Sequence, residues 1–191
     1  MKGFASSQDT GFTLIELLVT IAIAAILLVL ATPSFVSYQR SSELTSAANS
    51  FVAGINAARG EAMKRGMNAM VVPATGTDWS SGWTIFVDLD RSGGLNSGDI
   101  TVVQQPALQS YFSATGQGTA SETPAYIMFD ASGYAKTKTS GFGALTMTIA
   151  RNDLSGTART DQTRRIVIAK SGRARACKPA TDTTCTATAE E

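Results

Sequence analysis

Residues 11–31 read GFTLIELLVTIAIAAILLVLA. The 20 residues from Phe12 to Ala31 are almost all apolar, and Glu16 is the one charged residue among them. Twenty residues of α-helix span about 30 Å, which is the thickness of a bilayer core. The stretch therefore predicts a single membrane-spanning helix near the N-terminus.

A short polar segment, Met1–Gly11, precedes this apolar run. A conventional signal peptide has a shorter apolar region, and its cleavage site follows that region. Here the polar-to-apolar boundary comes first, between Gly11 and Phe12. A peptidase that cuts at this boundary would remove only the leader and would leave the apolar helix on the mature protein.

Glu16 interrupts the apolar pattern. A charged side chain inside a membrane span costs about 2.5–3.5 kcal/mol on insertion scales and rarely lacks a function. Two interpretations stay open. Glu16 lies close enough to the new N-terminus to reach the membrane interface, or it awaits a positive partner on another chain.

The sequence GFTLIELLV resembles the prepilin signature of type IV pilins and type II secretion pseudopilins. The resemblance implies that a prepilin peptidase cuts between Gly11 and Phe12 and then N-methylates Phe12. It also implies that Glu16 pairs with the N-terminal amine of a neighbouring subunit during assembly. Pro33 matches a proline of the same family, and a proline inside a helix removes a hydrogen bond and kinks the helix.

This resemblance also sets the expected location and partners of the chain. It implies a single-pass protein of the inner membrane with its head in the periplasm. The subunit would then enter an extracellular pilus filament or a periplasmic pseudopilus, where its N-terminal helix contacts other pilin subunits.

After Pro33 the pattern becomes that of an amphipathic helix. Its apolar positions, which we expect to face the head, are Leu44, Ala48, Phe51, Val52, Ile55, Ala58 and Ala62. Six β-like runs separated by Gly, Ser, Asn and Asp clusters follow, at residues 68–72, 83–88, 100–104, 125–129, 145–150 and 164–169. This order predicts an α+β fold in which a long N-terminal helix packs on an antiparallel β-sheet head.

Four segments are therefore expected. They are a leader at 1–11, a membrane and filament-core helix at 12–33, an amphipathic helix at 34–66, and a β-rich head at 67–191 with a C-terminal disulfide loop.

The head resembles the GspH/FimT branch of pseudopilins and minor pilins. The residues that carry the resemblance are Trp79-x-x-Gly82-Trp83, Phe129-x-x-x-Gly133 and the strand Arg165–Ile168 running into Gly172-Arg173. We interpret both tryptophans as core residues, since large aromatic side chains dominate protein cores. The resemblance implies a minor pilin that primes or joins a type IV pilus, and an H-type pseudopilin of type II secretion is the alternative.

Composition argues against an enzyme. The net charge is only +1, no histidine is present, and the two cysteines are Cys177 and Cys185. The lack of histidine removes the commonest general base and metal ligand, and the sequence has no nucleophile elbow, phosphate loop or CxxC pair. Neither catalysis nor a cofactor is expected. Two nearby cysteines in an exported chain indicate one disulfide.

One segment has the spacing of calcium ligands. Oxygen-bearing side chains fall at EF-hand-like positions in residues 88–99, and they are Asp88, Asp90, Ser92, Asn96 and Asp99. An aspartate closes the loop where a bidentate glutamate is usual, and strands rather than helices flank it. A Gly-, Asn- and Asp-rich hairpin turn explains the same residues without a metal, so both interpretations stay open.

Positive charge is concentrated near the C-terminus. Arg151–Lys178 contains eight basic and two acidic residues, a local net charge of +6. Segregated positive charge is typical of a polyanion-binding surface, and Gly172-Arg173-x-Arg175 is similar to the GRxR motif of DNA-uptake minor pilins. The predicted contacts to double-stranded DNA are Gly172, Arg173, Arg175, Arg165, Lys170 and Lys178. The alternative is a solvated basic edge that deters aggregation or docks another pilin.

Overall fold

The first element, α1 (Leu14–Arg65), is a helix of 52 residues that contains both the apolar run and the amphipathic pattern. The computed structural model describes residues 11–188, except for the side chain of Pro33, so leader residues 1–10 lie outside the described residues. The chain divides into two compact units, residues 1–40 and 41–191. Because this border falls inside α1, the last part of the helix belongs to the same unit as the strands.

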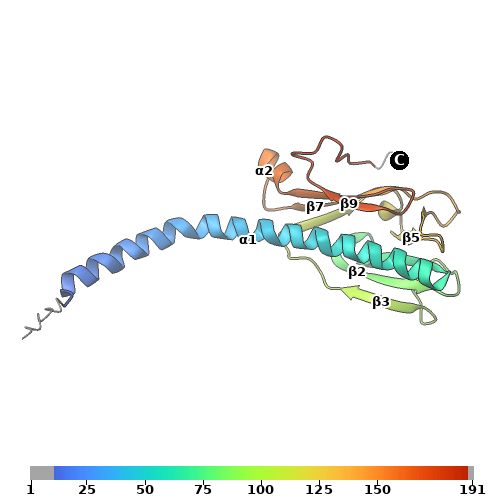
Figure 1. Ribbon diagram of the computed structural model, residues 1–191, viewed down its shortest axis with the longest axis horizontal. Coiled ribbons are helices and arrows are strands. Elements are labelled where there is room, and N and C mark those ends of the chain that lie inside the picture. Colours follow the sequence, from blue (N-terminus) through green and yellow to red (C-terminus); the bar gives the residue numbers. More distant parts are fainter. Residues whose placement is uncertain (1–10, 189–191) are drawn as a thin grey trace, which may run out of the picture. The chain divides into compact units, whose positions relative to one another are not determined.

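The elements after α1 are mostly short strands, which can be followed in Figure 1. In chain order they are β1 (Asn68–Thr75), β2 (Asp78–Asp88), β3 (Ile100–Gln105), β4 (Phe112–Gly116), the 3-10 helix η1 (Gly118–Ser121), β5 (Ile127–Phe129), β6 (Ala135–Lys136), β7 (Leu145–Arg151), α2 (Gly156–Asp161), β8 (Thr163–Ile168) and β9 (Ala174–Cys177).

The C-terminal part of α1 buries the face that its apolar spacing predicts. Six of the seven predicted positions are buried, and Val52 is half-buried. Gly66 follows the last helical residue with a φ of +66°, and the N–H of Met67 donates to the carbonyl of Ala62 at 3.2 Å. The helix therefore ends at a glycine in the left-handed conformation, which is a common helix terminator.

The strands form two antiparallel sheets, ordered β3-β2-β1-β5-β6 and β4-β7-β8-β9. The predicted α+β fold with a long N-terminal helix is confirmed, with two sheets in place of one. The sequence does not predict β4, β6 and β9, because each is short and lacks a run of β-branched residues.

The strand β9 corrects one expectation about the C-terminus. The run expected at 164–169 as the last strand is β8, and β9 pairs with it in antiparallel register, Val167 opposite Arg175. Gly172 and Arg173 therefore lie in the connection between two strands, and Arg175 lies within a strand.

Two tryptophans of β2 anchor the sheet to α1. Trp79 and Trp83 are 0% and 2% exposed. Their rings pack edge-on against Phe51 of α1, with centroid distances of 5.8 and 4.9 Å, and the indole N–H of Trp79 donates to the carbonyl of Ala120 at 2.8 Å. The interpretation of both tryptophans as core residues is confirmed.

Candidate functional site

The N-terminus of α1 is closed by reciprocal hydrogen bonds between Thr13 and Glu16. The backbone N–H and the hydroxyl of Thr13 each donate to Oε2 of Glu16 at 3.2 Å, and the N–H of Glu16 donates to Oγ1 of Thr13 at 3.3 Å. This is a capping box, in which a Thr-x-x-Glu pair satisfies donors at a helix start. Glu16 therefore has a partner within its own chain.

The apolar part of α1 presents its side chains outward. Every large apolar side chain described between Phe12 and Val36 is exposed. Among the described residues, α1 is also the one helix long and apolar enough to cross a bilayer. Because water disfavours so much apolar surface, this part of the helix needs a membrane or the apolar helices of other subunits around it.

The C-terminal strands form a hairpin with exposed cations at its turn. We name residues 163–177 the basic hairpin. Its turn is closed by the N–H of Gly172, which donates to the carbonyl of Ala169 at 2.8 Å, and by the N–H of Ala169, which donates to the carbonyl of Arg173 at 3.0 Å. Lys170 and Arg173 are exposed here, and within residues 11–188 their side chains make no hydrogen bond or ion pair. Both cations are therefore available to an anion.

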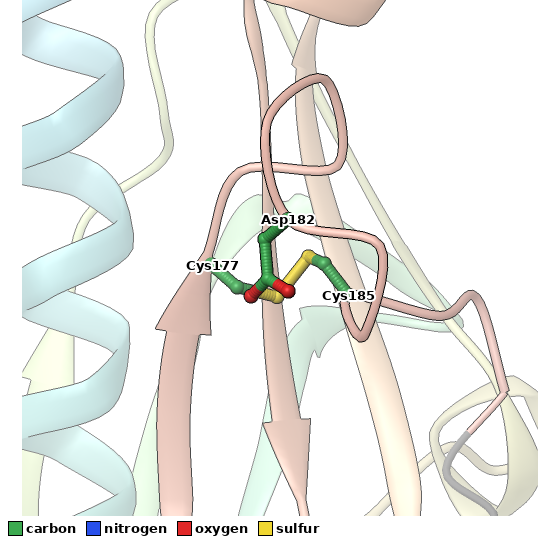
Figure 2. A group of neighbouring side chains, drawn as sticks. All are labelled: Cys177, Asp182 and Cys185. Atoms are coloured by element: carbon green, nitrogen blue, oxygen red, sulfur yellow. A yellow bond between two sulfur atoms is a disulfide. The ribbon is translucent and has the colours of Figure 1, made fainter.

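A disulfide closes the segment that follows the basic hairpin. It joins Cys177, the last residue of β9, to Cys185 (Figure 2), so the predicted disulfide is confirmed. We name residues 178–184 the disulfide loop. The carboxylate of Asp182 points toward the two sulfur atoms in Figure 2, within 4.8 Å. Because both sulfurs are oxidised, they offer no thiolate, which is the form of cysteine that ligates a metal.

Two of the predicted DNA contacts hold this C-terminal segment. The guanidinium of Arg175 donates to Oδ2 of Asp182 at 3.2 Å and to the carbonyl of Thr184 at 2.7 Å. Arg165 donates to the carbonyl of Cys185 at 2.6 Å. Hydrogen bonds from Thr184, with a smaller contribution from Arg175, lower the pKa of the Asp182 carboxyl. Arg165 and Arg175 are therefore already committed to contacts within the chain.

Other basic residues of the C-terminal stretch are also engaged. Arg151 is buried and pairs with Asp153 at 2.7 Å, and Arg164 donates to Oγ1 of Thr45 at 3.3 Å. Lys178 is half-buried. The net charge of this stretch is consequently not spread over one open patch, and among the described residues its exposed cations without a hydrogen bond or ion pair are Lys170 and Arg173, at the turn of the basic hairpin.

Gly172 is buried against a second glycine. It has a φ of +76°, and a Cβ added there would lie 2.0 Å from the carbonyl oxygen of Gly133. Nε of Arg59 donates to the same oxygen at 2.9 Å, and the N–H of Ala135 donates to the carbonyl of Lys170 at 3.0 Å. Gly172 therefore positions the turn, and its burial keeps it from direct contact with a DNA phosphate.

The loop between β2 and β3 brings all five predicted calcium ligands together. The carboxylate oxygens of Asp88, Asp90 and Asp99 lie within 4.8 Å of one another. Asp88 accepts two backbone N–H groups at 3.0 Å, Asp99 accepts the N–H of Asn96 at 2.9 Å, and Nδ2 of Asn96 donates to Oγ of Ser92 at 3.0 Å. Burial raises the pKa of Asp88, whereas the backbone N–H of Ser92 lowers the pKa of Asp90. The loop is closed by its own hydrogen bonds, and calcium binding stays a prediction.

Two family descriptions match this sequence. The prokaryotic N-terminal methylation motif matches residues 6–32. The description type II transport protein GspH matches residues 47–172, which is more than half of the chain. This chain belongs to the GspH family. The predicted resemblance to the GspH branch of pilin-like proteins is thereby confirmed, while a search of curated protein sequences found no significant match.

Solved structures with the fold of this GspH-family chain come from two kinds of filament. The type IV minor pilin FimU of Pseudomonas aeruginosa aligns with a TM-score of 0.55 and 25% identity, over 74% of this chain and 92% of its own. The minor pseudopilin EpsH from the type II secretion system of Vibrio cholerae aligns with a TM-score of 0.52 and 17% identity, over 74% and 98%. The chain is therefore a minor pilin or a pseudopilin, a subunit that assembles with other pilins.

The match to the GspH family ends at Gly172. Arg173, Arg175 and the disulfide loop lie after the matched range. At the other end, Gly11 and Phe12 lie within the methylation motif and are exposed, and their cleavage and methylation stay predictions. Sequence reasoning missed the role of Thr13, although its spacing from Glu16 is the signature of a capping box.

Proposed function

We propose that this chain is a minor pilin of a type IV pilus. The observation that carries the proposal is the likeness to FimU, which covers 92% of that minor pilin at 25% identity. The likeness to EpsH is weaker in sequence, at 17% identity, and supports the fold alone. The proposed role is structural and not enzymatic, as is that of the filament subunits it resembles.

In this proposal the N-terminal helix first anchors the subunit in the membrane and then packs in the filament. In this proposal a prepilin peptidase cuts between Gly11 and Phe12 and methylates Phe12, and α1 holds the subunit in the inner membrane with its head in the periplasm. Glu16 then pairs with the amine of a neighbouring subunit, and Pro33 breaks the hydrogen-bond ladder of the helix during packing. The exposed apolar face of α1 supports this sequence of events.

Deleting the gene for this chain from its bacterium tests whether the protein belongs to a type IV pilus or to a type II secretion system. We expect the deletion to reduce surface pili and the intact gene to restore them, with the mature protein present in sheared pili by immunoblot. Secretion of folded proteins through a type II system should continue. Normal pili together with failed secretion would instead identify an H-type pseudopilin, and the proposal would then be wrong.

A second proposed role is DNA binding at the turn of the basic hairpin. The observation that favours it is a pair of exposed cations at one turn, Lys170 and Arg173, which have no side-chain partner within residues 11–188. Guanidinium groups bind phosphate oxygens in a bidentate manner. A surface that contacts the backbone alone carries no sequence information, so we expect DNA binding without sequence preference.

Variants of the two arginines in the motif test this role. For the full-length chain in detergent micelles, Arg173→Ala should weaken duplex binding, and the slope of log affinity against log salt should become shallower by about 0.9, the value for one lost phosphate contact on B-DNA. Arg175→Ala should change the slope less, because its guanidinium is already bonded to Asp182 and Thr184. Arg173→Lys is the matched control that keeps the charge. If the double variant Arg173→Ala with Arg175→Ala binds duplex with unchanged affinity, the Gly172-Arg173-x-Arg175 motif is not a DNA site.

A further inference from the structure

Two aromatic rings of the head lie on its surface. Tyr134 and Phe142 are 44% and 55% exposed, whereas the other aromatic side chains of residues 41–191 are buried or half-buried. The two rings pack edge-on with centroids 6.1 Å apart. Burying such a side chain normally favours folding by about 1.5–3 kcal/mol. Two rings that stay exposed side by side are therefore a candidate contact surface for a ligand.

This aromatic pair lies beside the turn of the basic hairpin. The backbone contacts the turn on both sides of Tyr134. Gly133 abuts Gly172 so closely that a Cβ would not fit between them, and the N–H of Ala135 donates to the carbonyl of Lys170 at 3.0 Å. The backbone of residues 133–135 is therefore in direct contact with the turn of the basic hairpin, although the two segments lie far apart in the sequence.

Lys136 adds a third cation to this surface. Its Nζ lies 4.1 Å from the centroid of the Phe142 ring, and a β-bridge joins the two residues. The nearby acid Asp130 directs its Oδ1 toward the backbone N–H groups of Ser132 and Tyr134. We name the aromatic-basic surface by five residues: Tyr134, Lys136, Phe142, Lys170 and Arg173.

We propose that the aromatic-basic surface binds single-stranded DNA. This rests on the DNA-binding role proposed above and adds the form of DNA that is bound. Unpaired bases stack on Tyr134 and Phe142, while Lys170 and Arg173 bind the phosphates. Stacking platforms combined with cations are the usual means of binding single strands. Bases in a duplex already stack on one another inside the helix, so two exposed rings favour an unpaired strand.

A docking site for another pilin fits this surface less well. Lysine is depleted at the core of protein–protein interfaces. Here an ammonium group covers one face of the Phe142 ring, and two further cations lie along the neighbouring turn. The same cations are favourable next to a polyanion.

Fluorescence anisotropy of the full-length chain in detergent micelles tests the proposal. The probes are a labelled oligonucleotide of about 20 nucleotides, longer than the roughly 4–16 nucleotides that one single-strand binding fold covers, and the duplex made with its complement. We expect the single strand to bind more tightly. Tyr134→Ala with Phe142→Ala should weaken single-strand binding by about tenfold or more and leave duplex affinity nearly unchanged. Val103→Ala, which truncates an exposed side chain of β3, is the matched control.

A second measurement does not depend on truncation. The Phe142→Trp variant places a tryptophan at position 142, whereas the native Trp79 and Trp83 are buried and shielded from DNA. Quenching of tryptophan fluorescence by the single strand therefore reports stacking at position 142. The single-strand proposal is wrong if the chain binds both forms of DNA equally, if no quenching occurs, and if Tyr134→Ala with Phe142→Ala changes no affinity. This holds even when Arg173→Ala weakens binding to both forms. Failure to bind either form overturns the DNA-binding role as well. Loss of filament incorporation in the alanine variants with unchanged DNA binding would show a pilin contact instead.

Discussion

Replacing Glu16 by alanine is expected to reduce incorporation of the subunit into filaments by roughly 100-fold or more. In the filament proposed above, Glu16 forms a buried ion pair with the amine of a neighbouring subunit. Removing one partner of such a pair leaves the other charge uncompensated, at a cost of about 3–5 kcal/mol, and each 1.4 kcal/mol is about a factor of ten. The head should stay folded, because residues 41–191 form a compact unit of their own. Immunoblots of sheared filaments against whole membranes measure the effect.

The capping box at the start of α1 provides the controls for this prediction. Glu16→Gln keeps an acceptor at the capping position but removes the charge. Thr13→Val removes the hydroxyl that bonds Glu16 but keeps the charge. If charge pairing drives assembly, the glutamine variant should fail and the valine variant should assemble. The reverse pattern would show that Glu16 acts through its own helix, and mass spectrometry must show that all variants are processed alike.

In the assembly proposed above, Glu16 has two partners at two stages. In the isolated subunit its carboxylate accepts hydrogen bonds from Thr13 of the same chain. In the proposed filament it is met by the amine of a neighbour. The intrachain bonds lower the cost of holding a carboxylate in apolar surroundings before assembly. A positively charged partner adds a Coulombic attraction that a hydroxyl does not offer.

The parts of the fold that the sequence predicts correctly are those set by local rules. The burial of Phe51 and Ile55 follows from helical periodicity. The helix α1 ends at Arg65, beside the boundary expected at residue 66, where Gly66 adopts the left-handed conformation that commonly ends helices. The burial of Trp79 and Trp83 follows from the size of their apolar rings. Each of these expectations needs only neighbouring residues or the chemistry of one side chain.

The candidate site could be predicted only in part, because charge in a sequence does not show which charges are already paired. Arg164 contacts Thr45, a residue 119 positions away, and Arg165 contacts the carbonyl of Cys185, 20 positions away. Such partners depend on sheet pairing and on the path of the disulfide loop. The sequence identifies a basic stretch, whereas the structure identifies Lys170 and Arg173 at one turn as exposed cations that make no hydrogen bond or ion pair with any other residue the structure describes.

The contact between Gly133 and Gly172 is the clearest case of a non-local requirement. Both glycines belong to motifs of the head, Phe129-x-x-x-Gly133 and Gly172-Arg173, but nothing in the sequence indicates that they meet. Both have positive φ, at +78° and +76°. The structure gives the reason for both motifs at once, since they let two backbone segments approach without side chains between them.

Replacing Gly172 by alanine is therefore expected to destabilise the head by about 3 kcal/mol or more. A left-handed conformation costs a non-glycine residue roughly 1–2 kcal/mol. The added Cβ would also lie 2.0 Å from the carbonyl oxygen of Gly133, which is held by Arg59 and cannot move aside as a flexible side chain would. For a chain of this size the melting temperature should fall by about 6–12 °C, as measured by thermal unfolding of the detergent-solubilised chain.

Two other glycines separate backbone strain from the steric contact. Gly76 has a φ of +53° and nothing within 4 Å of an added Cβ, so Gly76→Ala should cost only the backbone term. Gly133→Ala should fall in between, because its added Cβ meets the flexible side chains of Met63 and Arg59. Equal stability of the Gly172 and Gly76 variants would contradict the contact. The melting temperatures also help to interpret DNA binding. If Gly172→Ala loses DNA binding and melts at a lower temperature, the turn is displaced. If Arg173→Ala loses DNA binding but keeps full stability, a phosphate contact has been removed.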